Sequence, residues 1–307
     1  MILLAGIPSE PPVRLVAERL AERGAPVAVF DQRHWDESWL DAEVRGRRIT
    51  GALGLPGGEV ALESVHGVFT RLMDDSRLPD IEPEPAGSPR REACRSLHAG
   101  IAEWFEATGA RVLNRARPQA SNSSKPYQAQ RIRAQGFSVP ETLITNDPDA
   151  VLRFRERHGR IVYKSASGVR SIVREFGADD AARLALIRWC PTQFQERVPG
   201  TDVRVHVVGR RAFATEIASE ATDYRYATRD GGSAELRPAD LPEPLLERCI
   251  GLADSLGLPL AGIDLRLAPE GRVVCFEVNP SPAFSYYESQ TGQRISAAIA
   301  EWLLDGG

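Results

Sequence analysis

The sequence predicts a parallel α/β unit at the N-terminus followed by two α+β units. In the first third of the 307 residues, short apolar runs alternate with segments whose apolar residues recur every three or four positions. This alternation is typical of strands that alternate with helices. Further along, several strand-like runs follow one another directly and helices stand before and after them, which is typical of α+β units. We therefore expect an α/β plus α+β chain built in three parts.

The expected boundaries follow from composition. The stretch "NRARPQASNSSKP" is rich in Asn, Ser and Pro and marks the first boundary. We expect an N-terminal α/β domain over residues 1–117, a central subdomain over 118–191 and a C-terminal subdomain over 192–307.

The N-terminal elements support a sheet covered by helices. The runs "MILLAG" and "PVAVFD" flank the amphipathic "VRLVAERLAERG", and a helix is expected over "REACRSLHAGIAEWFEATGA", between the strand candidates "HGVFTRL" and "RVLN". This order favours parallel strands with helices on their faces. The segment "DDSRLPDIEPEPAGSP" is acidic and rich in proline, so we expect an exposed loop there.

The other two parts carry helices and successive strands. Helices are expected around Pro126–Gln135, Pro148–His158 and Pro244–Leu256, and "ISAAIAEWLL" predicts a closing amphipathic helix. Strands are expected at "RIVYKSAS", "RSIVREF", "TQFQERV", "DVRVHVVG" and "RAFATEIA". The segment "LAGIDLRLAPEGRVVCFEVNP" predicts a hairpin with its turn at "PEG".

Composition limits the classes of function. Hydrophobic residues make up 42% of the chain, the net charge is −4 and the isoelectric point is about 5.9, so no global basic field attracts nucleic acid or a membrane. The four cysteines form no Cys-x-x-Cys, which favours a reducing compartment over disulfides or a zinc knuckle. No apolar run reaches the ~18 residues of a spanning helix. We expect a cytoplasmic protein.

Several enzyme classes lack their motifs here. The sequence contains no Gly-x-Ser-x-Gly of serine hydrolases, no Walker-type phosphate loop and no His-Glu-x-x-His of zinc proteases. The isolated histidines are expected to be surface residues or hydrogen-bonded interior residues.

Two polar residues interrupt the last apolar strand. Glu277 and Asn279 are two apart, so their side chains point to the same face. A two-residue turn at Glu270 and Gly271 places Asp264 directly opposite Glu277. Facing carboxylates are unfavourable unless a cation lies between them, and Mg²⁺ prefers one or two carboxylates together with phosphate oxygens. Asp264, Glu277 and Asn279 are thus a candidate magnesium site; the alternative is a solvated sheet face with ordinary charges.

An ordered set of motifs from about Asn114 to Asn279 resembles the ATP-grasp superfamily, in its glutathione synthetase/RimK-like branch. The segments are "SSKPYQAQRIRAQGFSVPET", "RIVYKS", "QERVPGTDVRVHVVG", "DYRYATRDGGS", "GIDL" and "FEVNPSP". The resemblance implies a three-part ATP-grasp fold in which the two α+β subdomains clasp ATP.

The resemblance also implies roles for individual residues. Lys125 and Lys164 are the ATP lysines, Asp202 lies near the ribose, and the segment Glu196, Arg197 and Val198 receives the adenine. Arg204 and Arg225 are the catalytic cations, which hold phosphate or stabilise the acyl phosphate. Asp264, Glu277 and Asn279 bind Mg²⁺.

The implied activity is ATP-dependent ligation of a carboxylate to an amine through an acyl phosphate, with ATP and Mg²⁺ as cofactors. The substrate is an amino acid, a peptide or a peptide side chain. The alternatives are a non-catalytic nucleotide-binding module and a macrocyclase that forms peptide esters or amides. Branch members often form homo-oligomers, and no membrane partner is expected. Arg71, in "FTRLMDD", is a candidate for meeting a substrate carboxylate, and a charged strand end is its alternative.

This chain departs from the branch at two points. The loop after Lys164 keeps Gly168 alone of several glycines, and Ala227 stands where an asparagine is usual. The glycine-poor loop and the Glu-x-x-Thr-Gly run from Glu288 to Gly292 are similar to ATP-grasp ligases that crosslink ribosomally made peptides. The alternative for that run is a connector to the last helix.

Overall fold

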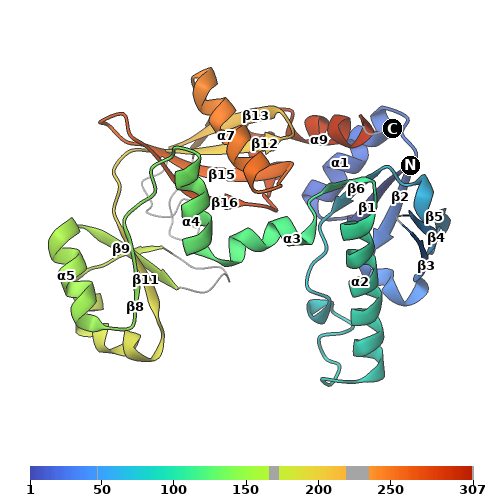
Figure 1. Ribbon diagram of the computed structural model, residues 1–307, viewed down its shortest axis with the longest axis horizontal. Helices are drawn as coiled ribbons and strands as arrows, with labels where there is room; N and C mark the ends of the chain where they lie inside the picture. Colours follow the sequence, from blue (N-terminus) through green and yellow to red (C-terminus); the bar gives the residue numbers. More distant parts are fainter. Residues whose placement is uncertain (47, 166–172, 219–234, 306–307) are drawn as a thin grey trace.

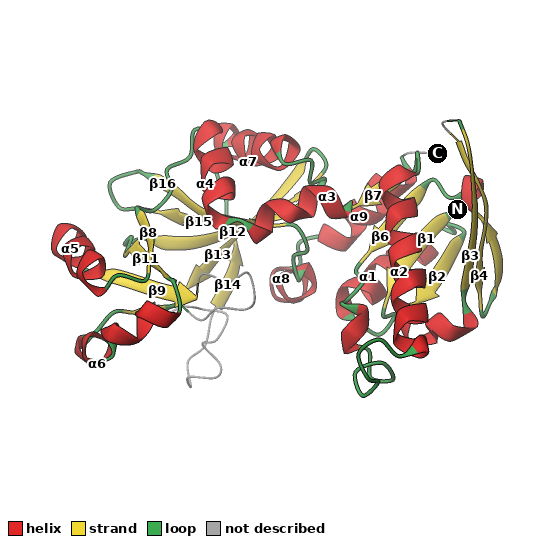
Figure 2. Ribbon diagram, turned by 60° about the horizontal axis from the view of Figure 1, so that its bottom comes forward, coloured by secondary structure: helices red, strands yellow, loops and turns green. Residues whose placement is uncertain are grey.

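The computed structural model describes residues 1–46, 48–165, 173–218 and 235–305. Three bodies lie in a row in two views (Figures 1 and 2): a sheet carrying α5 at one end, a larger antiparallel sheet in the middle, and the N-terminal sheet at the other end. The combination of a parallel sheet with antiparallel sheets confirms the predicted mixed α/β and α+β class.

The N-terminal sheet is parallel, as predicted, with the strand order β2-β1-β6-β7. One face packs against α1 and α9, and the other packs against α2. Because α9 is the last helix, the C-terminal end of the chain completes the core of the N-terminal sheet. The elements are β1 (Ile2–Gly6), α1 (Pro11–Glu22), β2 (Val27–Asp31), β6 (Gly67–Thr70), α2 (Pro89–Ala107), β7 (Arg111–Leu113) and α9 (Ile295–Leu304).

A small antiparallel sheet beside this domain was not predicted. It consists of β3 (Trp39–Arg45), β4 (Arg48–Leu55) and β5 (Gly58–Ala61). Most β3 residues are exposed, so the strand lacks the apolar alternation that marks a half-buried strand. Gly51 is required by the pairing, because a Cβ there would lie 2.1 Å from the Asp41 carbonyl oxygen.

The acidic, proline-rich segment after β6 is largely exposed, as predicted, and two buried apolar residues anchor it. Leu78 and Ile81 are fully buried and pack against Trp35 and Cys94. Asp80 accepts a hydrogen bond of 3.0 Å from the Trp35 indole. Two apolar residues spaced three apart within a polar stretch therefore suffice to fix it.

The second sheet is antiparallel, with the order β10-β9-β11-β8. Its core centres on Phe154, Phe176 and Phe194. The predicted strand "RSIVREF" is described only at its end, as β10; its earlier residues lie outside the described part of the chain. The elements are β8 (Thr142–Thr145), α5 (Pro148–His158), β9 (Ile161–Ser165), β10 (Arg174–Glu175), α6 (Ala178–Ala182) and β11 (Thr192–Glu196).

The third sheet has the order β14-β13-β12-β15-β16 and carries α4 and α7 on one face. β16 is its edge, and α4 covers that edge. Near its other end, α8 packs between this sheet and the N-terminal domain. The elements are α4 (Lys125–Ala134), β12 (Thr201–Val208), β13 (Arg211–Ala218), β14 (Glu235–Pro238), α7 (Glu243–Ser255), β15 (Leu260–Leu267), β16 (Val273–Asn279) and α8 (Phe284–Thr291).

The packing crosses the predicted segment boundaries. Helix α4 packs on β16, and β11 pairs within the second sheet although residue 192 opens the third predicted segment. The domain boundaries at residues 117 and 191 stay a prediction. The larger hydrophobic cores contain residues that are far apart in the sequence.

The Glu-x-x-Thr-Gly run lies in α8, which was not predicted. The Glu288 carboxylate accepts hydrogen bonds of 2.7 Å from the Ser296 amide and 2.6 Å from its hydroxyl. The Thr291 hydroxyl donates to the Tyr287 carbonyl at 2.7 Å. In this structure the run fixes the start of α9.

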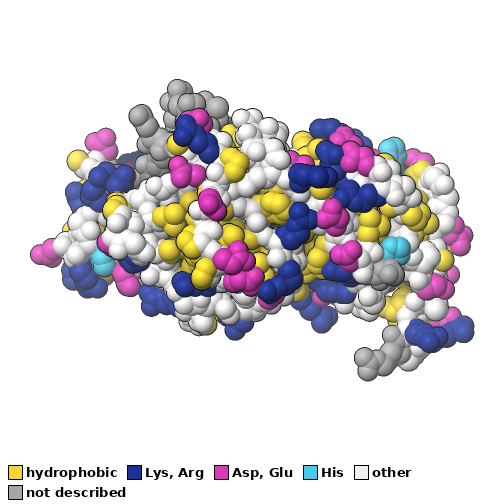
Figure 3. Space-filling view, turned by 90° about the horizontal axis from the view of Figure 1, so that it is seen from above, with side chains coloured by type: hydrophobic (Ala, Val, Ile, Leu, Met, Phe, Trp, Pro, Cys, Tyr) yellow, Lys and Arg dark blue, Asp and Glu magenta, His cyan; other side chains and the backbone are white. Residues whose placement is uncertain are grey.

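The face shown in Figure 3 carries basic and acidic side chains interspersed, without a region of one sign. None of the helices in the described ranges is long and apolar enough to cross a bilayer.

The four cysteines are free thiols with different environments. Burial raises the pKa of Cys94 and of Cys249 to about 12 and that of Cys275 well above its usual range, whereas Cys190 is exposed. Since the thiolate is the reactive form, we expect a thiol reagent to titrate one cysteine in the native protein and all four after denaturation. Cys190→Ser should remove the native reaction, and rapid native titration of more than one thiol would contradict the burial of the other three.

Candidate functional site

Asp264 lies directly opposite Glu277 on neighbouring strands, as the hairpin predicted. The turn, however, is one residue longer than expected: Leu267 pairs with Val273, and the Ala268 amide bonds the Arg272 carbonyl at 2.9 Å. A register shift at Asp264 and Leu265 then restores the predicted pairing. The facing pair was right, but it depends on a β-bulge that the sequence did not reveal.

Each carboxylate of this pair has a cation beside it. The Arg204 guanidinium lies 2.9 Å from Asp264, and the Lys125 ammonium lies 3.0 Å from Glu277. The Lys125 ammonium also donates to the Asn122 side-chain oxygen at 2.8 Å. The two cations offset the repulsion expected of facing carboxylates.

The Arg204 side chain lies in a confined space beside Gly262 and Tyr287. Its side chain is 6% exposed and lies with its guanidinium 5.7 Å from the centre of the Tyr287 ring. A Cβ at Gly262 would be 2.5 Å from Arg204 Nη1 and 2.8 Å from Pro282. The glycine of "GIDL" therefore leaves the space that the guanidinium occupies.

Asp202 and Arg204 are two apart on β12, so their side chains share a face of the strand. Asp202 binds Arg266 on the neighbouring strand, at 2.7 Å. Arg266 also donates to the Val198 carbonyl at 2.8 Å. This arginine, which the sequence did not single out, links the predicted ribose residue to the predicted adenine segment.

Asn279 ends β16 on the same side as Glu277. Its side-chain oxygen accepts a hydrogen bond of 2.9 Å from the Ser281 amide, which shapes the turn that follows. No group of three or more His, Cys, Asp or Glu side chains suited to a metal occurs among the described residues. A magnesium ion at this place would therefore have Asp264, Glu277 and the neutral oxygen of Asn279 as protein ligands, which suits an ion that completes its shell with phosphate and water.

Two buried amides fix this strand end. The Gln128 side chain donates to the Val278 carbonyl at 2.8 Å and accepts from its amide at 3.0 Å, which satisfies the edge of β16. Asn114 donates to the carbonyls of Leu260 and Pro280, both at 2.6 Å. These contacts place Lys125, one turn before Gln128 on α4, against Glu277.

A cavity of about 260 Å³ contains both predicted ATP lysines. Lys125 enters it from α4 and Lys164 from β9, beside Gln193, which is directly opposite Lys164 in the strand register. The walls are partly apolar, with Val139, Ile144 and Phe276 among them. A cavity with apolar walls and two cations suits a nucleotide, which has an apolar ring and anionic phosphates.

The predicted adenine segment begins at Glu196, the last residue of β11, which is the strand that carries Gln193. Glu196 accepts hydrogen bonds from the Glu141 amide at 3.2 Å and from Arg272 at 3.3 Å. Arg197 lies 3.4 Å from Glu175, and Val198 is buried. The segment thus joins the second sheet to the third.

His206 is buried in the third sheet beside Arg204, and neither ring nitrogen has a hydrogen-bond partner among the described residues. The expectation of a hydrogen-bonded interior histidine is therefore wrong here. Burial, with a smaller contribution from the Arg204 charge, holds the pKa of His206 well below its usual range. A lowered pKa favours the neutral ring, whose centre lies 4.7 Å from that of the Tyr287 ring.

This histidine makes stability depend on pH. The unfolded chain gains a proton as the pH falls below about 6.5 while the folded chain does not, so the free energy of unfolding should fall by up to about 1.4 kcal/mol per pH unit there. His206→Phe should remove this loss, measured by urea unfolding at pH 7.5 and 5.5. The exposed His34→Gln should keep it, and an equal loss in His206→Phe would contradict a neutral buried ring.

Three residues that the resemblance singled out lie outside the described residues: Arg225, Gly168 and Ala227. Their predicted roles therefore rest on the sequence alone.

Fold and site together define an ATP-grasp ligase: two antiparallel units flank a cavity with two lysines, beside facing acidic residues on neighbouring strands. Residues 132–303 match the RimK-like ATP-grasp domain, and the chain belongs to this family. It is an ATP-dependent carboxylate–amine ligase, as predicted.

Relatives and solved structures share this assignment. The chain is 30% identical over 210 residues to a probable alpha-L-glutamate ligase from Enterobacter sp. (strain 638), covering 65% of this chain and 69% of that protein. It is 28% identical over 210 residues, with the same two coverages, to the ribosomal protein bS6–L-glutamate ligase of Salmonella paratyphi B.

Among solved structures, the ATP-grasp ligase PsnB complexed with a minimal precursor superposes with a TM-score of 0.82 at 26% identity, over 99% of this chain and 98% of that one. PsnB has also been solved with Mg and ADP. The macrocyclase MdnC from Microcystis aeruginosa MRC, bound with precursor peptide MdnA, has the same fold, with a TM-score of 0.82 at 24% identity over the full length of both chains.

Proposed function

We propose that this ligase activates a carboxylate of a peptide substrate with ATP and joins it to an amine. In the first step a carboxylate oxygen attacks the γ-phosphorus of ATP, which gives an acyl phosphate and ADP. In the second step an amine nitrogen attacks the acyl carbon, phosphate leaves, and the amine loses a proton as the amide forms. The observation that carries the proposal is the facing pair Asp264 and Glu277 beside a cavity that holds Lys125 and Lys164.

The protein's part in this chemistry is to position groups and neutralise charge. Lys125 and Lys164 bind phosphate oxygens. Arg204 adds a third cation, which lies beside the Asp264 carboxylate. Asp264, Glu277 and Asn279 would hold magnesium, which would supply positive charge to neutralise the phosphates. Because Lys125 lies on Glu277 in the free protein, it has to exchange part of that contact for phosphate when nucleotide binds.

The remaining assignments complete the nucleotide site. The segment of Glu196, Arg197 and Val198 holds the adenine, and Asp202 lies at the ribose. Arg266 connects the two parts, because it binds both the Asp202 carboxylate and the Val198 carbonyl. Arg225 stabilises the acyl phosphate or the oxyanion that follows it.

A peptide is the favoured substrate. One relative is named for ligation of glutamate to a ribosomal protein, and structures of PsnB contain precursor peptides. The fold matches PsnB over 99% of this chain, and the matched part includes the N-terminal sheet.

The test is ADP release by the full chain with Mg–ATP, with and without a substrate pair. An acidic, lysine-containing peptide should stimulate ADP release and lose the mass of one water for each amide formed, whereas free glutamate with free lysine should stimulate it less. Equal stimulation by the free amino acids would overturn the peptide assignment. Nucleotide binding with no stimulation by any carboxylate–amine pair would assign the chain as a binding module.

A further inference from the structure

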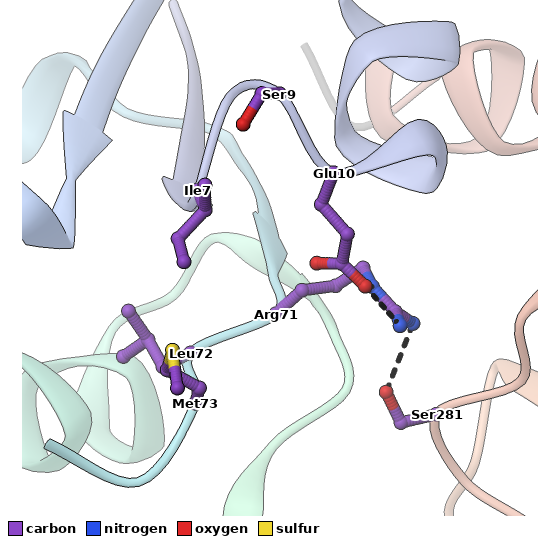
Figure 4. A pocket seen from close by; sticks show the side chains of 7 residues that line it. All are labelled: Ile7, Ser9, Glu10, Arg71, Leu72, Met73 and Ser281. Atoms are coloured by element: carbon purple, nitrogen blue, oxygen red, sulfur yellow. Dashed lines mark hydrogen bonds and ion pairs between the residues drawn. The ribbon is translucent and has the colours of Figure 1, made fainter. Parts of the chain in front are cut away.

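A second cavity, of about 350 Å³, lies outside the nucleotide cavity (Figure 4). Its walls come from three places in the sequence: the segment after β1, the segment after β6 and the turn after β16. The lining residues are Ile7, Ser9, Glu10, Arg71, Leu72, Met73 and Ser281.

The position of this cavity favours a ligand site. From β1 the sheet continues to β2 on one side and to β6 on the other, so β1 and β6 flank the point where the strand order reverses. In open parallel sheets, ligands bind beyond the carboxyl ends of the strands at this point. The cavity also reaches Ser281, whose amide bonds Asn279 of the proposed magnesium site.

The walls favour a single carboxylate over a phosphate. Helix α1 begins at Pro11 and Pro12, which have no amide hydrogen, and Glu10 precedes them, so its N-terminus offers little to an anion rich in oxygens. The one cation among the lining residues is Arg71. Ile7, Leu72 and Met73 form an apolar wall suited to methylene groups (Figure 4).

Hydrogen bonds hold the Arg71 side chain in place, whereas the Glu10 carboxylate can be replaced by another carboxylate. Arg71 Nη1 donates to the Ser281 hydroxyl at 3.0 Å and to the Pro282 carbonyl at 3.3 Å, and its side chain is 12% exposed. Its Nε and Nη2 both donate to one oxygen of Glu10, Oε1, at 2.9 and 2.6 Å. Glu10 is 33% exposed, so its side chain can move away into solvent. A substrate carboxylate could then accept from Arg71 Nε and Nη2 with both of its oxygens, where Glu10 uses one.

We propose that this cavity binds the acidic side chain of the peptide substrate, with its carboxylate on Arg71 in place of Glu10. The inference rests on the proposed ligase function and names the residue that selects the carboxylate. Glu10 forms the ion pair with Arg71 when no substrate is bound, so the buried arginine keeps a partner. Any other small anion would have to displace the Glu10 carboxylate in order to bind Arg71.

The experiment uses N-acetyl-glutamic acid N-methylamide as a probe and the glutamine analogue as its uncharged control. Binding to the full chain is measured by calorimetry, with and without Mg–ADP. We expect the acidic probe to bind and the glutamine analogue to bind at least about tenfold more weakly, the scale of a hydrogen-bonded charge. Arg71→Met should lose the same factor, and Arg71→Lys, which lacks the planar fork, should lose part of it.

Glu10→Gln is the discriminating variant. It keeps a side chain that can accept a hydrogen bond from Arg71 but removes the competing charge, so it should tighten binding of the acidic probe several-fold, whereas a merely structural Glu10 would leave it unchanged or weaken it. Weaker binding in Glu10→Gln, equal binding of both probes, or no binding of the acidic probe to the wild type would overturn the proposal. This variant decides the matter even if Arg71→Met fails to fold.

The same measurements separate this inference from the ligase function. Mg–ADP binding and peptide-stimulated ADP release with no effect of Arg71 on the probe would reject the cavity alone. Probe binding that depends on Arg71 in a chain that releases no ADP with any peptide would reject the ligase function and retain the cavity.

Discussion

Glu277→Gln should reduce substrate-dependent ADP release by about a hundredfold or more, the scale of losing one group that stabilises charge during the reaction. Glu277 is one of two carboxylates that face each other at the edge of the nucleotide cavity. Glutamine keeps the size of the side chain and a neutral oxygen but removes the charge that holds a divalent cation. The measurement is a coupled assay for ADP over a range of magnesium concentrations, in which the variant should also need more magnesium for its residual rate.

Glu270→Gln is the matched control for this experiment. Glu270 lies in the turn of the same hairpin, 56% exposed and 3.2 Å from Arg272, away from the facing pair. Its removal should leave the rate and the magnesium requirement unchanged. Since Glu277 also holds Lys125, thermal unfolding of both variants shows whether the strand end is intact. Full turnover by Glu277→Gln would reject the metal assignment.

Much of the fold could be predicted because local and global signals agree. The closing helix Ile295–Leu304 and the helix Pro148–His158 begin and end where the sequence predicted. Proline marks the start of the second of these helices and histidine its end, whereas the closing helix is a largely apolar run in which most residues are buried. The parallel N-terminal sheet followed from alternating strand and helix signals. The exposed strand β3, and with it the sheet of β3 to β5, was missed because almost no side chain of β3 is buried.

The sequence predicted the charged residues of the site. It did not predict the residues that hold these charged side chains and their strands in position. Lysines and carboxylates stand out in apolar strands, so Lys164 and Glu277 could be found. Gln128, Asn114 and Arg266 act through partners 64 to 166 residues away, and a single amide or arginine in a sequence gives no sign of such a partner. The bulge that brings Asp264 opposite Glu277 is likewise a property of the folded ladder.

Arg204→Met should lower the free energy of unfolding by about 3 kcal/mol, because removing one partner of a buried ion pair leaves the other charge uncompensated. Arg204 is 6% exposed and lies 2.9 Å from Asp264, which in turn faces Glu277. Without the guanidinium, Asp264 would lose the cation that lies 2.9 Å from it while still facing Glu277, which Lys125 contacts. Methionine fills a similar volume, so the loss should report charge more than packing. The measurement is urea unfolding of the free protein at neutral pH.

Two further variants show that charge is the cause. In Arg204→Met combined with Asp264→Asn, the uncompensated carboxylate is gone, so most of the lost stability should return while ADP release stays low. Arg210→Met is the exposed control: Arg210 is 68% exposed beside Glu247, and removing such a surface pair should cost about 0.5 kcal/mol or less. Magnesium should raise the stability of Arg204→Met more than that of the wild type, since a divalent cation between Asp264 and Glu277 replaces the missing positive charge. If the double variant is as unstable as Arg204→Met, the arginine stabilises the sheet through packing against Tyr287, and the ion pair has little part in it.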